Sequence, residues 1–399
     1  MARSMFHTIT SAEMRSVNRS AVLDHIRRNS PVARSAIAHN LKLSLPTVMR
    51  IVDELIAHGW VRPTGTKEWS SRRRRDLLEY YKDGHAVIGV DLGGTKMFGA
   101  LANIGGEIIG EQTINGHGTS DAESYAMLEE IIGALMRVPR PRGQKIRGIA
   151  VGAPGVTRAH TGIVEWAPSL NWRAFPLQQK LAKRFRLPCI VDNDVNLAAL
   201  GEQWFGAADG ASNLVLIAIG TGVGAGLIVD GVLYRGHHEA AGEAGFLLSD
   251  RAELDQRYEK FGALESIISG TGIAERAQRS LAGKRSPEHL AHITSQDVFE
   301  AYRRREAWSI PLMDETIDYL SIAIVNISTL LDPELIILGG GVSESADVIL
   351  PAVQARIQNI LPQMPTLKVS TLGRRAAVMG AIAQIVHATS DYFVARKMI

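Results

Sequence analysis

The sequence predicts an α/β protein that consists of a small helical head and a larger body of two related lobes. Three observations support this organisation. Residues 1–84 have the pattern of three helices and a hairpin, and they carry 15 Lys and Arg against 8 Asp and Glu. From His85 onward, buried strands alternate with helices, and two glycine-rich turns lie far apart in the chain. The remaining 315 residues carry 29 basic and 33 acidic side chains, so a basic head precedes a mildly acidic body.

The overall composition is that of a globular protein with more than one domain. The chain has 399 residues, of which 46% are hydrophobic, and can bury large cores. A single cysteine, Cys189, excludes an internal disulfide and a zinc site built on cysteines. The N-terminus lacks the apolar stretch of a signal peptide, and the apolar run at 214–229 is too short to span a bilayer. These features predict a cytoplasmic protein without a membrane partner.

The head, residues 1–84, has the element order of a winged helix-turn-helix. Pro31 follows the first helix and prevents its continuation, Ser44 is a suitable N-cap for the third helix, and Gly59 ends that helix. Apolar residues at helical spacing form the core face of the third helix. Helices are expected over 14–28, 34–41 and 45–58, and strands from residue 60 and over 76–81, on either side of a polar loop at 65–75.

The charge and spacing of the head predict binding to operator DNA. Thr47 and Arg50 point away from the apolar face, early in the third helix, where such helices usually contact base edges. Four adjacent guanidinium groups in the wing repel one another unless phosphates lie near them. An alternative is that this run is a solvated linker. The expected DNA-binding residues are Thr47, Arg50, Arg72, Arg73, Arg74 and Arg75.

In the body, residues 85–399, both glycine turns join two strands, as expected where backbone N–H groups hold phosphates. Asp91 in the first turn can position Mg²⁺, and Lys96 can contact phosphate oxygens. One such turn alone is compatible with an ordinary hairpin, but two turns favour a nucleotide clamp. The residues expected to bind nucleotide in these turns are Asp91, Gly93, Gly94, Thr95, Lys96, Gly220, Thr221, Gly222 and Gly224.

Three further segments carry polar or glycine residues at the ends of expected strands. Asn193 and Asp194 follow the strand at 189–191, where they can grip sugar hydroxyls or simply cap the next helix. Glu243 lies between glycines, and Gly340 and Gly341 follow the strand at 335–338, where a flat base can lie against the backbone. For Glu243 and for this glycine pair, an ordinary glycine loop is an equally good interpretation.

The order of these motifs resembles the ROK family (repressor, open reading frame, kinase), in its repressor form with a winged helix in front. The resemblance covers about residues 12–390 and implies an actin-like body of the sugar kinase or hexokinase type, usually dimeric. It implies that Asn193 and Asp194 bind sugar, with Asp194 as the catalytic base in kinase members. It also implies sugar-binding roles for Glu243 and Glu265, and phosphate-binding roles for both glycine turns.

The chain departs from the family pattern at its zinc site. The family motif around Glu243 usually ends in Gly-His, whereas this chain has Gly245-Phe246. The cysteine cluster expected before Glu265 is absent, so we expect no zinc and assign no residue as a ligand of a metal bound by the protein alone. His237 and His238 lie nearby and are interpreted as ordinary surface or hinge residues.

Three functions remain compatible with these patterns. The favoured one is a sugar-responsive transcriptional regulator of the repressor type that acts as a homodimer or higher homo-oligomer. The second is an ATP-dependent sugar kinase, with Mg-ATP as cofactor, that carries a DNA-binding head. The third is a DNA-binding protein whose body only dimerises, and the intact Asn193-Asp194 pair argues against it. The sequence does not decide whether the chain is an enzyme.

Overall fold

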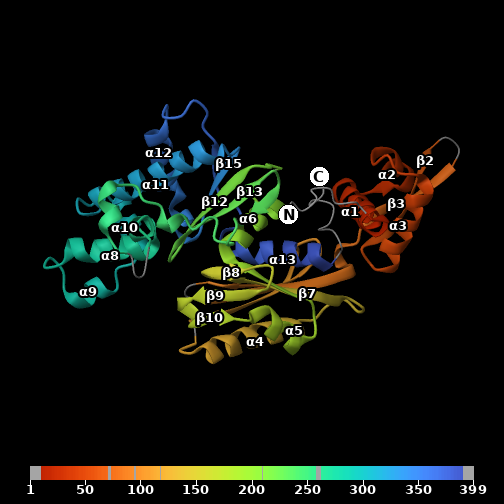
Figure 1. Ribbon diagram of the computed structural model, residues 1–399, viewed down its shortest axis with the longest axis horizontal. Helices are drawn as coiled ribbons and strands as arrows, with labels where there is room; N and C mark the ends of the chain where they lie inside the picture. Colours follow the sequence, from red (N-terminus) through yellow and green to blue (C-terminus); the bar gives the residue numbers. More distant parts are fainter. Residues whose placement is uncertain are drawn as a thin grey trace, which may run out of the picture.

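A computed structural model describes residues 10–70, 73–93, 96–116, 118–208, 210–257 and 262–389; the side chains at 12–13, 67–70, 73–75 and 289 lie outside this description. The molecule has three parts (Figure 1): the head at the right, a first lobe below and a second lobe at the upper left. In the described part of the chain, no helix is both long and apolar enough to span a membrane.

The head is a winged helix-turn-helix, as predicted. Its third helix buries the apolar face, and the Ser44 hydroxyl accepts a hydrogen bond from the backbone N–H of Thr47 at 3.3 Å, which caps the helix. The three strands pair in the order β1-β3-β2. The elements are α1 (Ser11–Asn29), β1 (Val32–Ala33), α2 (Arg34–Asn40), α3 (Leu45–Ala57), β2 (Val61–Ser70) and β3 (Arg73–Tyr80).

The prediction of a loop over residues 65–75 is wrong, because most of this segment forms the paired strands of a hairpin. Strand β2 continues to Ser70 and pairs with β3 from Arg73 onward, after a register shift between Pro63 and Lys67. The segment lacks the alternation of apolar and polar residues that identifies a half-buried strand. Its pairing is therefore visible in the backbone but not in the hydropathy of the sequence.

The first lobe contains a five-stranded sheet in the order β11-β7-β4-β5-β6 and a small sheet, β10-β9-β8. Helices α4 and α5 pack beside these sheets (Figure 1). The elements are β4 (His85–Leu92), β5 (Lys96–Asn103), β6 (Ile108–Asn115), α4 (Asp121–Arg137), β7 (Lys145–Ala153), β8 (Val156–Arg158), β9 (Ile163–Ala167), β10 (Trp172–Phe175), α5 (Leu177–Phe185), β11 (Cys189–Asn193) and α6 (Asp194–Phe205).

The second lobe contains a five-stranded sheet in the order β14-β13-β12-β15-β16. The elements are β12 (Leu214–Ile219), β13 (Val223–Val229), β14 (Val232–Tyr234), α7 (Glu265–Ile268), α8 (Gly270–Leu281), α9 (Pro287–Ala291), α10 (Ser295–Arg303), α11 (Ser309–Leu331), β15 (Leu335–Gly339), α12 (Ala346–Ile357) and β16 (Thr366–Val369). They are followed in the chain by α13 (Ala376–Thr389), which packs on the first lobe. A short 3-10 helix (Gly341–Ser345) follows β15.

The two large sheets share one plan, which confirms the expectation of two related lobes. In each, three consecutive strands form an antiparallel meander, and two later strands extend the sheet in parallel from its first strand. Strands β4 and β12 are the central strands of the two sheets. Each glycine turn therefore joins the central strand to its antiparallel neighbour, at the same position in both lobes.

Helices α6 and α13 pack together at the junction of the two lobes. Helix α6 contacts β7 and β11 in the first lobe and β12 and β13 in the second, whereas α13 packs on β4 and β7. A Cβ atom at Gly380 would lie 1.7 Å from the carbonyl oxygen of Leu197, and one at Gly201 would lie 2.2 Å from that of Ala376. Glycine at both positions lets the helix backbones touch.

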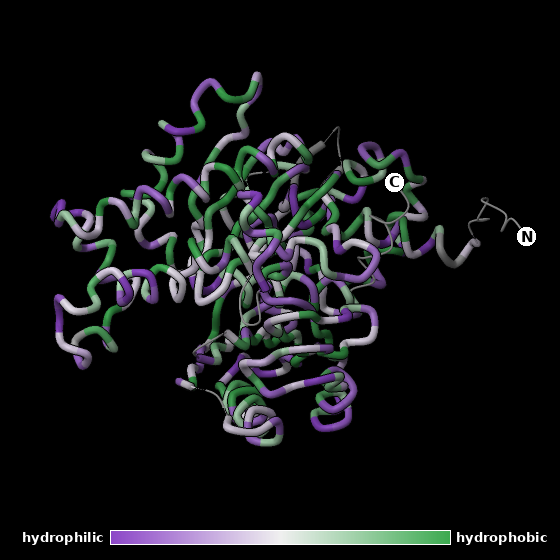
Figure 2. Tube along the Cα trace, turned by 60° about the vertical axis from the view of Figure 1, so that its left-hand side comes forward, coloured by the Kyte–Doolittle hydropathy of each residue, from purple (hydrophilic) through white to green (hydrophobic). Residues whose placement is uncertain are grey.

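One hydrophobic core joins the head to the body. It includes Trp60 and Leu78 of the head, apolar residues of α6 and α13, and the side of β12 and β15 that faces them. Figure 2 shows apolar segments gathered in the interior and polar segments along the outer helices and loops. The head is therefore packed against the body rather than suspended on a free linker.

Candidate functional site

The candidate site begins at one edge of the first sheet, where β4, β7 and β11 end. The strand register places Asp91 and Asp192 on either side of Gly152, in one row across three parallel strands. A Cβ atom at Gly152 would lie 3.2 Å from the Cα atom of Asp194. Acidic side chains from β4 and from the β11–α6 connection thus converge at this edge.

The first glycine turn joins β4 to β5 beside this row. Gly93 follows Leu92, and Lys96 is the exposed first residue of β5. Gly94 and Thr95 lie outside the described residues. One carboxylate oxygen of Asp91, Oδ1, is buried and has no hydrogen-bond partner within the described structure. A buried carboxylate oxygen without a donor fits a site that is completed by a cation or a hydroxyl group.

The second glycine turn joins β12 to β13. The N–H of Gly220 donates to the carbonyl oxygen of Gly222 at 2.9 Å, and Thr221 is exposed. A Cβ atom at Gly222 would lie 2.8 Å from Glu265 Oε2, and one at Gly224 would lie 3.0 Å from Val195. Neighbouring side chains therefore explain two of the glycines, whereas Gly220 faces open space.

Asn193 and Asp194 lie where β11 passes into α6. The Asn193 side chain caps the helix by accepting from the N–H of Asn196 at 3.0 Å, and its amide donates to the carbonyl oxygen of Gly155 at 3.1 Å. Asp194 Oδ1 accepts from the N–H of Val195 at 2.9 Å. The capping interpretation is thus correct for Asn193, and the Oδ2 atom of Asp194 forms no hydrogen bond with another described residue.

Four carboxyl groups interact electrostatically between the lobes. Burial and the negative charge of Asp194 raise the pKa of Asp91 to about 8, against the opposing effect of Lys96. Burial, with a contribution from Glu243, raises the pKa of Asp194 to about 7. Burial also raises the pKa of Glu243 and of Glu265, and the charge of Glu265 adds to the effect on Glu243.

The four carboxyl groups are suited to the recognition of hydroxyl groups. A protonated carboxyl group donates and accepts hydrogen bonds, whereas a carboxylate only accepts them. Groups whose pKa lies near neutrality can exchange between these roles when a ligand binds, and such perturbed groups concentrate at functional sites. Glu265 is held in place because its Oε2 atom accepts from the N–H of Val223 at 2.8 Å.

Two polar contacts between the lobes, one of them an ion pair, were not predicted from the sequence. Asp192, buried directly before Asn193, accepts from Arg235 at 2.5 Å and from Gln384 at 2.7 Å. Glu239 accepts from His160 Nδ1 at 2.5 Å. Asp192 belongs to the Asp-Asn-Asp motif that the sequence places after an apolar strand, but no local pattern identifies Arg235 as the partner that this buried carboxylate needs.

The remaining candidates lie around the second lobe. Gly340 has a φ of 78°, and a Cβ atom there would lie 2.4 Å from the carbonyl oxygen of Ile219, whereas Gly341 faces open space. Phe246 is 57% exposed, and His237 and His238 are exposed with their rings in edge contact. Within the described ranges, no three His, Cys, Asp or Glu side chains lie close enough together to hold a metal ion.

In the head, Arg50 is exposed on α3 and pairs with Glu54 at 3.2 Å, and Thr47 bonds the Ser44 hydroxyl at 2.8 Å. Met49 is 47% exposed beside them and was missed, because an apolar residue on a helix is normally assigned to the core. Arg72 lies outside the described residues. Strand β3 begins with Arg73, Arg74 and Arg75, whose side chains are not described.

Fold and site together define a class of protein in which a winged-helix DNA-binding head precedes a body of the sugar-kinase type. Residues 87–388 match the ROK family, and residues 15–62 match the winged helix-turn-helix DNA-binding family. The chain belongs to the ROK family.

Known relatives include both regulators and kinases. A xylose repressor from Caldicellulosiruptor bescii is 31% identical over 94% of this chain and 96% of its own length. A glucokinase from Halalkalibacterium halodurans is 35% identical over 73% of this chain and 92% of its own length. A solved ROK family transcriptional regulator, a homolog of the E. coli MLC protein, aligns with a TM-score of 0.83 and 25% identity over 96% of this chain and 99% of that chain.

Proposed function

We propose that this protein is a sugar-responsive DNA-binding repressor of the cytoplasm, in which residues 1–84 bind operator DNA and residues 85–399 bind the sugar. The observation that carries the proposal is the presence, in one chain, of an exposed recognition helix and a site of four interacting carboxyl groups. The xylose repressor aligns along both parts. The sugar is an aldose, with xylose and glucose as the first probes.

The sugar site consists of Asn193, Asp194, Glu243 and Glu265. The first two lie in the first lobe and the other two in the second, so a sugar held by all four bridges the lobes. Phe246 stands where the family usually has a histidine, so this site offers one polar contact fewer. We therefore propose a sugar that needs no hydrogen bond at this position.

Helix α6 provides a direct connection from the sugar site to the head. It begins with Asp194, and near its other end the ring of Trp204 lies 4.5 Å from the guanidinium group of Arg27 on α1. The buried carboxylate of Glu202 accepts from Leu372 N at 3.1 Å, which ties the same end of α6 to the turn before α13. A change in lobe position on sugar binding would therefore displace a contact with the head.

The joint between head and body is also tightly packed. His85 Nε2 lies 2.7 Å from the carbonyl oxygen of His58, and the His85 ring contacts that of Trp60 edge-on. The Tyr80 hydroxyl donates to the carbonyl oxygen of Ile104 at 3.1 Å. A Cβ atom at Gly84 would lie only 2.0 Å from the carbonyl oxygen of Gly59. This joint leaves little slack, so a movement of the body is transmitted to the head.

We propose that the protein acts as a homodimer, so that two heads engage two half-sites of an operator. Exposed apolar side chains on the second lobe support this assembly. Ile322 and Leu330 are 40% and 83% exposed and lie eight positions apart on α11, which places them on one face of the helix. Light scattering of the purified protein tests the assembly state.

The test of the proposed function uses DNA that the full chain selects from a random-sequence library. Xylose, glucose and N-acetylglucosamine are each titrated into the complex, and DNA affinity is followed by fluorescence anisotropy. The effector should change the affinity by about 5–150-fold, and DNA should change sugar affinity by the same factor. Asp194→Ala should abolish the effect, whereas Asp230→Ala, at an exposed turn, should preserve it. An effect that survives Asp194→Ala unchanged would place the sugar site elsewhere.

A second candidate function is ATP-dependent phosphorylation of the sugar, because the relatives include a glucokinase. The residues present fit Mg-ATP: Asp91 has a buried oxygen without a partner, and Gly220 and Gly341 face open space. Asp91 and Lys96 would hold the metal and phosphates, and bound Mg-ATP supplies the phosphoryl group. Asp194 would take the proton of the attacking hydroxyl, which its pKa of about 7 suits at neutral pH.

A coupled ADP-release assay across aldoses tests this second function. Sugar-dependent turnover that disappears in Asp194→Asn would support it, and calorimetry that detects no ATP binding at saturating sugar would exclude it. We propose that no zinc is bound, since the cysteine cluster is absent from the sequence. Elemental analysis of dialysed protein measures this directly.

A further inference from the structure

The positive charges of the body are concentrated in two segments of the first lobe. Residues 137–147 and 177–188 together contain nine Lys and Arg and no Asp or Glu. The rest of the body contains 20 basic and 33 acidic side chains. A local excess of this size in an otherwise acidic body marks a surface for a polyanion.

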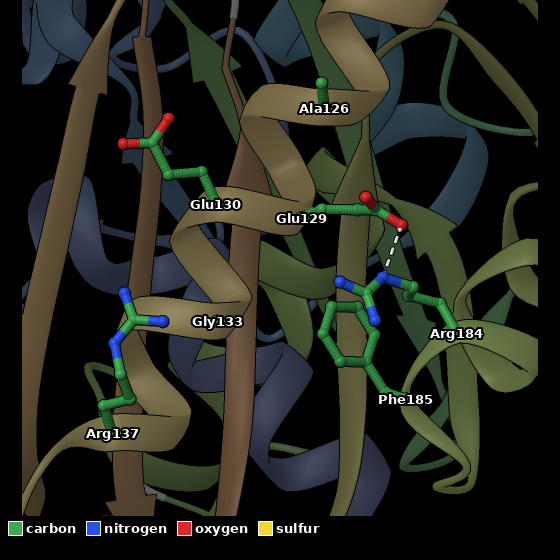
Figure 3. A pocket seen from close by; sticks show the side chains of 7 residues that line it. All are labelled: Ala126, Glu129, Glu130, Gly133, Arg137, Arg184 and Phe185. Carbon is green, nitrogen blue, oxygen red and sulfur yellow. Dashed lines mark hydrogen bonds and ion pairs between the residues drawn. The ribbon is translucent and has the colours of Figure 1, made fainter.

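The two segments meet between α4 and α5, and we call the surface formed there by Arg137, Lys180, Lys183, Arg184 and Arg186 the basic face. Arg137 and Arg184 line a hollow of about 320 Å³ between α4 and α5, and they flank Gly133 in Figure 3. A neighbouring hollow of about 470 Å³ is lined by Lys180, Lys183, Arg184 and Arg186. Both are open grooves along the outside of the lobe rather than enclosed cavities.

Among the residues that the structure describes, one of the nine cations of the two segments, Arg184, forms an ion pair with a carboxylate. Lys183 and Arg186 are exposed, and the carboxylates that line the two hollows are Glu129 and Glu130. Arg184 pairs with Glu129 at 3.1 Å. The Lys180 ammonium group lies over the Tyr125 ring, 5.0 Å from its centroid. Flexible cations of this kind suit a row of phosphates better than a single small anion, which needs a fixed cage.

Residues 137–147 run from the basic face to the joint with the head. The guanidinium group of Arg147 lies 5.6 Å from the centroid of the Trp60 ring, and Gln144 donates to the carbonyl oxygen of Asp83 at 3.0 Å. The segment that carries Arg137 at one end therefore contacts the head at the other.

We propose that the basic face binds the phosphate backbone of the DNA that flanks the site held by the head. The inference rests on the proposed DNA-binding function and extends the DNA contact from the head onto the body. Duplex DNA carries one charge per about 1.7 Å of its axis, so each additional stretch of duplex supplies phosphates for further cations. Contacts of this kind add affinity and orient the body on the DNA without reading its sequence.

The experiment measures the salt dependence of binding by the full chain to random-sequence duplexes of two lengths. A duplex of about 12 base pairs covers one half-site, and one of about 40 base pairs extends well beyond it. The test variant is Lys180→Gln/Lys183→Gln/Arg186→Gln. The matched control, Lys284→Gln/Arg304→Gln/Arg305→Gln, removes three exposed cations near α8 and α10, on the side of the second lobe away from the head (Figure 1).

On the long duplex, the test variant should flatten the slope of log K against log salt by about 0.9 for each cation–phosphate interaction that it removes. If all three substituted cations bind phosphates, raising the salt from 50 to 200 mM should lower the DNA affinity of the wild type by a factor about 40 times larger than the factor for the variant. The short duplex and the control variant should show unchanged slopes. A wild-type slope for the test variant on the long duplex would overturn the proposal.

Other results are equally decisive. Equal weakening on both duplexes would overturn the proposal, because the substitutions would then act on the head. If the substitutions change the oligomeric state but not the salt slope of DNA binding, the basic face is a contact between copies of the chain. If they change binding of an acidic protein but not the salt slope, the basic face belongs to that partner. Loss of all DNA binding by the wild type, on short and long duplexes, would instead refute the proposed function itself.

Discussion

Replacing Asp194 with Asn should stabilise the folded protein, and the gain should grow as the pH rises. Folding raises the pKa of Asp194 from 3.8 to about 7, chiefly because the carboxyl group is buried. A carboxyl group with a higher pKa in the folded state binds its proton more tightly there, so stability falls as the pH rises. This loss of stability is absent below about pH 4, the pKa of Asp194 in the unfolded chain, and is complete above about pH 7, its pKa in the folded protein.

The size of the effect follows from the same shift. One pKa unit corresponds to about 1.4 kcal/mol, so the shift sets an upper limit on the order of 4 kcal/mol. Because Asp91 and Asp194 share the repulsion, we expect a gain of about 2–3 kcal/mol at pH 8. The gain should be roughly half as large at pH 5.

Urea unfolding of wild type and variant at pH 5 and pH 8 measures this gain. Asp230→Asn, at the exposed turn between β13 and β14, is the control and should change stability by less than about 0.5 kcal/mol. Carbon NMR titration of the carboxyl groups should also show that the pKa of Asp91 falls in Asp194→Asn. A variant that is less stable than wild type at pH 8, with the Asp91 titration unmoved, would refute the proposed repulsion between the two carboxyl groups.

Three further predictions concern the helices. In thermal unfolding, Gly380→Ala should destabilise the protein by about 3 kcal/mol, because the new Cβ atom meets the backbone of α6. The control variant, Gly133→Ala in α4, should be neutral or stabilising in the same measurement. Trp204→Ala should reduce the sugar-dependent change in DNA affinity measured by anisotropy, since it removes the interaction with Arg27, and an unchanged sugar effect would exclude α6 as the route. Arg50→Ala should relax base preference by about 1–3 kcal/mol at one position in a selection experiment, and uniform weakening on all sequences would instead assign Arg50 to a phosphate.

Features that depend on neighbouring residues in the chain were predictable. The apolar spacing of α3, its Ser44 cap and the order of strands and helices all follow from local patterns. The two glycine turns were located for the same reason. The reason for glycine at positions 222 and 224 was not predictable, because these glycines make room for Glu265 and Val195, which lie elsewhere in the chain.

Features that depend on contacts between the lobes were not predictable from patterning. Asp192 and Arg235 are 43 positions apart, and no periodicity links them. The extension of β2 was missed because its polar residues do not alternate with apolar ones. The basic face was also missed, because its two segments are separated in the chain and the acidic remainder of the body offsets their charges in the net charge.

The place of α13 in the fold has a consequence for how the chain matures during synthesis. This helix covers the first lobe, yet it is encoded after the whole second lobe. At about 5–20 residues per second, the ribosome needs roughly 10–40 s to proceed from the end of α6 to the end of α13. During that interval the apolar face of β4 and β7 that α13 covers stays exposed to solvent. The nascent chain is therefore exposed to chaperones and proteases until α13 docks, and truncations that remove this helix should reduce the abundance of the protein in cells.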